Sequence, residues 1–144
     1  MSDADELLAQ LLSSKDRKVL AVWAADCAEH VLPLFEEKYP EDDRPSKAIE
    51  AARAWVRGEI RVGEARKAAL GAHAAARTAT DDAARAAARA AGHAAATAHV
   101  ARHALGPVMY ATKAAGFAAS AQEREWQLRH LLDLRDACGD TGAG

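Results

Sequence analysis

The sequence predicts an all-α protein, a compact single-domain bundle of six to seven helices with a long Ala-rich helix at its centre. Alanine, which has the lowest intrinsic cost of entering a helix, takes nearly half of the positions between Gly63 and Phe117. Elsewhere apolar residues recur at three- and four-residue steps, the pattern of a helix with one buried face. No segment shows the sustained two-residue alternation of a β-strand.

Two helices are expected before the first clear break. A short helix capped by Asp3 or Asp5 ends near Leu12. A longer helix follows over residues 16–37, and its predicted buried face consists of Leu20, Trp23, Ala24, Cys27, Val31 and Leu34. Pro33 lies inside this pattern, so we expect one helix with a kink near Glu29 to Pro33.

The segment from Tyr39 to Pro45 is the clearest turn, because two prolines and two aspartates in it oppose a helix. Pro45 suits the first turn of a third helix, which we expect to end near Arg57 because Gly58 follows. Its predicted buried residues are Ile49, Ala52, Trp55 and Val56.

The Ala-rich half is expected to form a fourth helix over residues 63–79 and a fifth from Asp82 to about Leu105. Thr80 or Asp81 caps the fifth helix, which would be about 35 Å long. A sixth helix is predicted over residues 108–119 and a last one over 121–134, which buries Trp126, Leu128, Leu131 and Leu132. We expect one domain over residues 1–138 and a disordered tail over 139–144.

Three glycines, Gly71, Gly92 and Gly116, fall inside predicted helices. Each costs a helix about 1 kcal/mol relative to alanine. We therefore expect close helix approach to compensate for that cost.

Composition disfavours several classes of protein. There are 19 Lys and Arg against 21 Asp and Glu, so no overall field draws the chain to nucleic acid or an anionic membrane. Cys27 and Cys138 lack metal-ligand spacing and are expected to be free thiols. The acidic start and the lack of a long uncharged apolar run predict a soluble, cytoplasmic protein with no secretory signal.

His99 and His103 lie four residues apart on one predicted helix, an arrangement found in zinc sites. The Glu of a zincin motif is missing between them, and the guanidinium of Arg102 disfavours a cation. His93 lies too far around the helix to join them easily. We therefore expect no metal and no other cofactor, and interpret the pair as hydrogen-bonding or partner-facing.

The charges at the start of the third helix have a structural and a functional interpretation. We prefer the structural one, in which Asp42 or Asp43 caps the helix and Arg44 pairs with a carboxylate from a neighbouring helix. In the other, these charges contact a partner or ligand. The full set of candidates for such contact is Asp42, Arg44, Glu50, Arg53, His93, His99, His103, Tyr110 and Lys113.

A family resemblance rests mainly on the turn Asp42-x-Arg44-Pro45 and on the residues that follow it, Ile49, Glu50, Arg53 and Trp55. It continues through the Ala-rich helices with Gly92-His93, Thr97-Ala98-His99 and His103-Ala104, and through Tyr110-Ala111-Thr112-Lys113-Ala114. This order, over roughly residues 20–132, resembles the small Ala-rich bacterial proteins known as putative immunity proteins of toxin–immunity systems.

The resemblance implies a non-catalytic cytoplasmic protein that binds and neutralises a cognate toxin domain. It supplies no toxin contact that can be transferred residue by residue. One alternative is a helical small-ligand or metal-binding protein, or an enzyme, that uses His93, His99 and His103 with Asp42 and Arg44. Another is a scaffold that only self-associates, so a homo-oligomer stays open.

Overall fold

The computed structural model describes residues 17–98, 110, 113, 116 and 120–142, and these residues form helices without any strand. The five helices are α2 (Arg17–Glu36), α3 (Arg44–Val56), α4 (Val62–Thr78), α5 (Asp82–Ala96) and α7 (Ser120–Gly142). The predicted all-α class is thereby confirmed. The helix expected before Leu12 lies outside the described residues, as does most of the one expected over 108–119.

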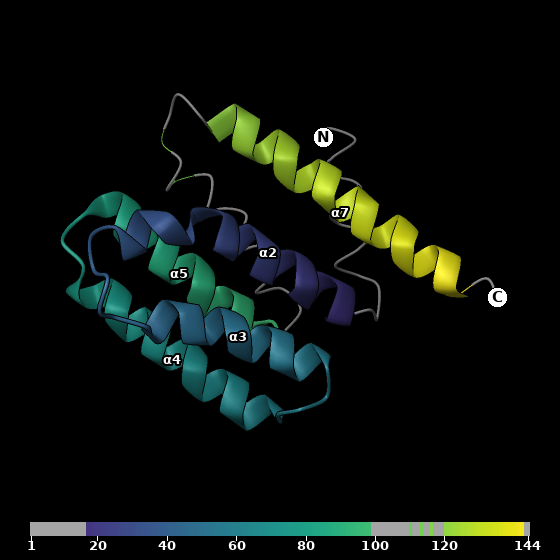
Figure 1. Cartoon of the computed structure of the whole chain (residues 1–144), viewed down its shortest axis with the longest axis horizontal. Helices are drawn as coiled ribbons and strands as arrows, with labels where there is room; N and C mark the ends of the chain where they lie inside the picture. The colour runs from purple at the N-terminus through teal and green to yellow at the C-terminus, as the bar shows by residue number, and fades with distance from the viewer. Residues whose placement is uncertain (1–16, 99–109, 111–112, 114–115, 117–119, 143–144) are drawn as a thin grey trace.

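The helices α2 to α5 run alternately in opposite directions and form one packed group (Figure 1). The Ala-rich α5 is the most extensively packed helix of this group, because it contacts α2, α3 and α4 and its contacts with α4 and α2 are the two largest between helices. The last helix, α7, packs along α2, on the side away from α3 and α4 (Figure 1). None of the described helices has the length and apolar character needed to cross a bilayer.

The core combines one helix of small side chains with another of large ones. The buried residues of α5 are all alanine or glycine, at positions 84, 86–88, 90–92, 94 and 95. Leu20, Trp23 and Phe35, all fully buried, come from α2, as does Cys27. Methyl side chains on α5 let the neighbouring axes approach closely, while the larger side chains of α2 supply more apolar burial per residue.

The predicted ends of α3 are confirmed. Pro45 lies in the first turn, where its missing amide leaves no hydrogen bond unmade. Gly58 has φ of +76°, and its amide donates to the Trp55 carbonyl while the Glu59 amide donates to Ala54. These two bonds form a Schellman motif, which closes the helix through the left-handed glycine.

α2 is a single helix through Pro33, as expected. Five of the six residues predicted for its buried face are buried, and Leu34 is half-buried. Cys27 is a free thiol inside the core. Burial, with smaller contributions from Glu123 and Asp26, strongly raises the pKa of this thiol. The Cys27 side chain is therefore held in its unreactive protonated form.

α5 begins as predicted but ends earlier. The Asp81 carboxylate caps it by accepting the Ala84 amide at 2.9 Å. The helix stops at Ala96, not near Leu105, so its 15 residues span about 22 Å. At this end the Thr97 hydroxyl donates to the His93 carbonyl at 3.0 Å, and the Ala98 amide donates three residues back, to Ala95, as in a tighter turn.

The last helix is longer than predicted, because α7 runs from Ser120 to Gly142 and not from 121 to 134. Residues 139–142, expected in a disordered tail, are helical. Each residue added to a helix already formed gains one backbone hydrogen bond, which lets α7 continue through Gly139 despite its low helix propensity. Gly116 is also not helical, since its φ is +86°.

Gly92 is the site where two helices approach through a missing side chain. A Cβ on Gly92 would lie 2.7 Å from Cε1 and Nε2 of His73, which belongs to α4. The expected compensation for a helical glycine is thus found here. Gly71 is different, because a Cβ there would meet nothing within 4 Å.

We predict that Gly92→Ala and Gly71→Ala change stability in opposite directions. Gly71→Ala should raise the free energy of unfolding by about 0.5–1 kcal/mol through helix propensity alone. Gly92→Ala should instead lower it by about 1 kcal/mol, because the His73 ring must leave its place. Urea denaturation followed by circular dichroism measures both, and equal stabilisation by the two changes would contradict the close approach.

Candidate functional site

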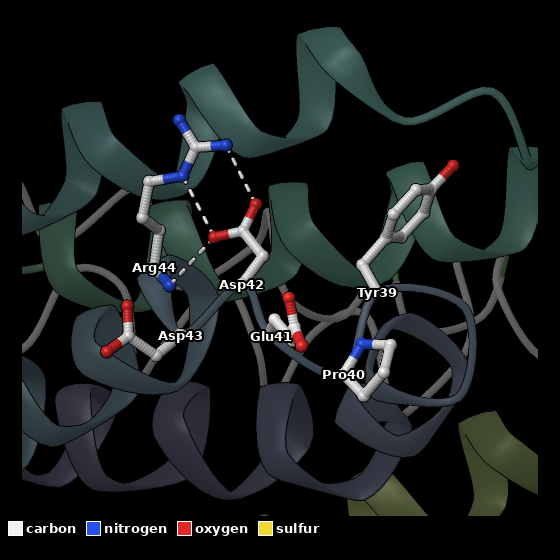
Figure 2. Close-up of a pocket in the computed structure, with 6 residues that line it drawn as sticks. All are labelled: Tyr39, Pro40, Glu41, Asp42, Asp43 and Arg44. Carbon is white, nitrogen blue, oxygen red and sulfur yellow. Dashed lines mark hydrogen bonds and ion pairs between the residues drawn. The ribbon is translucent and has the colours of Figure 1, made fainter.

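The turn before α3 forms an open hollow of about 590 Å³, lined by Tyr39, Pro40, Glu41, Asp42, Asp43 and Arg44 (Figure 2). Asp42 accepts hydrogen bonds from the backbone amide, Nε and Nη2 of Arg44 at 3.2, 2.9 and 2.7 Å. Figure 2 shows the Asp42 carboxylate facing the Arg44 guanidinium, with the Tyr39 ring directed away from this pair. The pair therefore stiffens one wall of the hollow.

Two details of the predicted turn need correction. Arg44 pairs with Asp42, two residues before it, and not with a carboxylate from a neighbouring helix. Asp43 occupies the N-cap position but makes no side-chain cap, and it pairs with Lys47 at 3.1 Å. The reason is reach: the guanidinium folds back onto a carboxylate that the turn already holds beside it, which forms a fork-to-fork pair at little conformational cost.

The turn is also tied to the connection between α4 and α5. The Thr80 amide donates to Tyr39 Oη at 2.8 Å, and the two hydroxyl groups of these residues lie 3.3 Å apart. The hydrogen bonds with Thr80 lower the pKa of Tyr39. Tyr39 thus links the start of α3 to the start of α5.

The pairing with Arg44 gives a prediction for the titration of Asp42. Hydrogen bonding by the Arg44 side chain lowers the pKa of Asp42 below its ordinary value of 3.8, against a smaller opposing effect of burial. A lowered pKa contributes stability above the unfolded-state value, and that stability is lost as the pH falls through the folded-state value. NMR titration should show the Asp42 midpoint rise toward 3.8 in Arg44→Ala and stay unchanged in Arg57→Ala.

Arg53 is the centre of an ion-pair network that joins α3 to α2. Its Nη2 donates to Asp26 at 3.0 Å and to Glu29, while Nη1 lies 3.9 Å from Glu50. Partial burial disfavours the charged guanidinium, but the hydrogen bonds to Glu29 and Asp26 outweigh this and raise the pKa of Arg53. Of the two predicted candidates here, Arg53 is committed to internal pairing, whereas Glu50 is exposed.

The ion-pair network around Arg53 extends to α7 through residues that were not among the predicted site candidates. Asp26 Oδ2 lies 2.7 Å from Nε2 of His130. His30 Nδ1 lies 2.8 Å from the buried carboxylate of Glu123. Between these two contacts the Trp126 ring stacks on both imidazoles, with centroid distances of 4.1 Å to His30 and 5.1 Å to His130.

The spacing of these residues is a signal that could have identified them. Asp26 and His30 are four residues apart on α2, and Glu123, Trp126, Gln127 and His130 recur at three- and four-residue steps on α7. Such spacing places each set on one face of its helix. Trp23 completes the contact by donating from Nε1 to the Gln127 carbonyl at 2.9 Å.

We predict that Arg53→Met destabilises the protein and that Arg57→Met does not. The partly buried Arg53 pairs with two carboxylates of α2, the partly buried Asp26 and the exposed Glu29, so its loss should lower the free energy of unfolding by about 1–2 kcal/mol. Arg57 pairs with Glu59 just beyond the end of α3, and both side chains are exposed, so its loss should cost less than about 0.5 kcal/mol. Equal unfolding midpoints for the two variants in urea would show that the network contributes nothing.

His93 lies in an imidazole cluster at the contact between α4 and α5. Its ring meets His73 edge-on at a centroid distance of 5.0 Å and stacks on Tyr110 at 5.4 Å. Arg89 Nη1 lies 2.9 Å from His73 Nδ1. Tyr110 is half-buried, and Lys113 is exposed.

These contacts decide which predicted candidates lie together. His93 lies with Tyr110 through ring stacking, while Asp42 and Arg44 pair with each other in a separate hollow. His99 and His103 lie outside the described residues. Within the part of the chain that the structure describes, no group of three or more His, Cys, Asp or Glu side chains could hold a metal ion.

Comparison with known proteins identifies one family. The family model described as Imm-5 like putative immunity protein matches residues 10–134, which is nearly the whole chain and includes α2 to α5 and the first part of α7. This match confirms the resemblance predicted from the turn and the helices after it. No curated protein and no solved structure matches the chain.

Proposed function

Because this chain belongs to the Imm-5 like putative immunity protein family, we propose that it binds a cognate toxin domain in the cytoplasm and neutralises it without catalysis. The observation that carries the proposal is the family match over residues 10–134. Binding is tighter when the contact surface is already formed before the partner arrives, because ordering a mobile surface reduces affinity.

The packed helices support this proposal by holding several surface features in place. On α3 and α4, a hollow of about 450 Å³ is lined by Arg44, Lys47, Glu64, Lys67, Ala68 and Gly71. On α4, Leu70 keeps 63% of its surface exposed. Leu70 follows Arg66 and Lys67 by four and three residues on the same helix, so an apolar side chain with basic neighbours is presented to a partner, as in the apolar centre and polar rim of a protein interface.

The first test is rescue from toxicity. A toxin-like gene beside this one should arrest growth when expressed alone, and co-expression of this protein should restore growth. Purified proteins should then form a complex by size-exclusion chromatography. Absence of binding and of rescue with every neighbouring toxin candidate would refute the proposal.

Stoichiometry separates binding from catalysis. When a fixed amount of active toxin is titrated with this protein, a binding inhibitor removes activity linearly and reaches completion near one equivalent. An enzyme that modifies or degrades the toxin would complete the loss well below one equivalent, given time. We expect the first result, and time-dependent loss at a small fraction of an equivalent would contradict it.

Leu70→Asp tests the α4 surface within the same experiment. Since the Leu70 side chain is exposed, this substitution should leave the thermal midpoint nearly unchanged while weakening toxin binding by about tenfold or more. Thr78→Asp, which adds the same single negative charge at an exposed position near the end of α4, is the control for charge. Equal effects of the two variants on binding would exclude a specific role for Leu70.

A further inference from the structure

A cavity of about 330 Å³ lies along α5, separate from the hollows described above. It is lined by Asp82, Arg85, Ala86, Arg89, Tyr110 and Lys113. Arg85 and Arg89 are four residues apart, so both point to one face of α5. The lining therefore carries three basic side chains against one carboxylate.

The two guanidinium groups are held mainly by neutral acceptors. Arg85 donates from Nε and Nη2 to the Ala79 carbonyl at 3.2 and 2.9 Å. Its contact with Asp82 is longer, 3.7 Å, and the Asp82 side chain is 95% exposed. A carbonyl oxygen positions a guanidinium without neutralising it. The positive charge of Arg85 therefore remains largely uncompensated within the cavity.

Arg89 is positioned in the same way by an imidazole. A guanidinium has donors and no acceptor, so its contact with His73 requires Nδ1 of His73 to be the unprotonated acceptor. The His73 ring is therefore neutral and leaves the charge of Arg89 intact. Gly92 leaves the space that this ring occupies.

The Tyr110 ring is held in place by the imidazole cluster of His73 and His93. It stacks on His93, which meets His73 edge-on, so the imidazoles support both Arg89 and Tyr110 where these line the cavity. Residues 99–119, the stretch that contains Tyr110 and Lys113, include no Asp or Glu. The positive charge of the cavity is thus not balanced by a carboxylate from that stretch.

We propose that this cavity binds an oxyanion, a phosphate or carboxylate group, through Arg85, Arg89 and Lys113, with the Tyr110 hydroxyl as a further donor. Guanidinium groups held in place before binding lose little conformational freedom when the anion arrives. Both anions are acceptor-rich and match the paired donors of arginine. The proposal does not depend on the toxin-binding function.

The test is NMR titration of the full chain with inorganic phosphate and, separately, with succinate, at constant ionic strength set with potassium chloride. The Nε–H signals of Arg85 and Arg89 should shift saturably. Arg89→Gln should weaken binding by about tenfold. Lys113→Gln, a change at an exposed side chain that does not put folding at risk, should weaken it by about two- to fivefold. Arg66→Gln is the matched control and should have no effect.

The two probes distinguish the source of the anion. Saturable binding of phosphate alone supports a phosphate site, and comparable binding of succinate supports a site for acidic side chains or small carboxylates. The proposal is overturned if neither probe shifts these signals saturably. It is also overturned if Arg89→Gln and Lys113→Gln bind both probes as the unchanged protein does.

Discussion

The arrangement of this protein depends on the close packing of α5, which buries only alanine and glycine against three other helices. Small side chains allow short distances between helix axes, but each buried methyl group contributes little to stability. The large apolar side chains must therefore come from elsewhere, and α2 provides them in Leu20, Trp23 and Phe35. The core thus divides its tasks between a helix that permits close approach and a helix that supplies burial.

The same close packing determines where polar side chains lie. A seam lined with alanine has no room for a charged group, so Arg85 and Arg89 lie at its margin, where α5 faces the cavity. His73 enters the contact between α4 and α5 only where Gly92 has no side chain. The attachment of α7 follows a different principle, because its contacts with α2 include hydrogen-bonded carboxylates and stacked rings as well as the buried Leu131.

Several helix ends could be predicted from the sequence, but the pairing of charged side chains could not. The effects of Pro45, Gly58 and Asp81 on helix ends are local, because each involves the conformation or hydrogen bonds of residues next to it in the sequence. These roles therefore follow from sequence alone. Arg53 meets Asp26 and Glu29 of another helix, and no spacing along the chain specifies that meeting. For Arg44 the prediction was wrong in the opposite sense: a carboxylate from another helix was expected, but the partner is Asp42, two residues away. The end of α5 at Ala96 could not be predicted from composition, because alanines at positions 98, 101 and 104 continue beyond it.

The way each arginine is held separates those that stabilise the fold from those that remain able to act on another molecule. Arg53 and Arg44 are paired with carboxylates, so their positive charges are largely compensated within the chain. Arg85 and Arg89 are oriented by a carbonyl and a neutral imidazole, which fix direction without cancelling charge. A net charge of −2 for the whole chain conceals this difference. The family of this protein implies recognition of a partner. Arg85 and Arg89, which are oriented by neutral groups, are therefore able to attract a negatively charged group of another molecule.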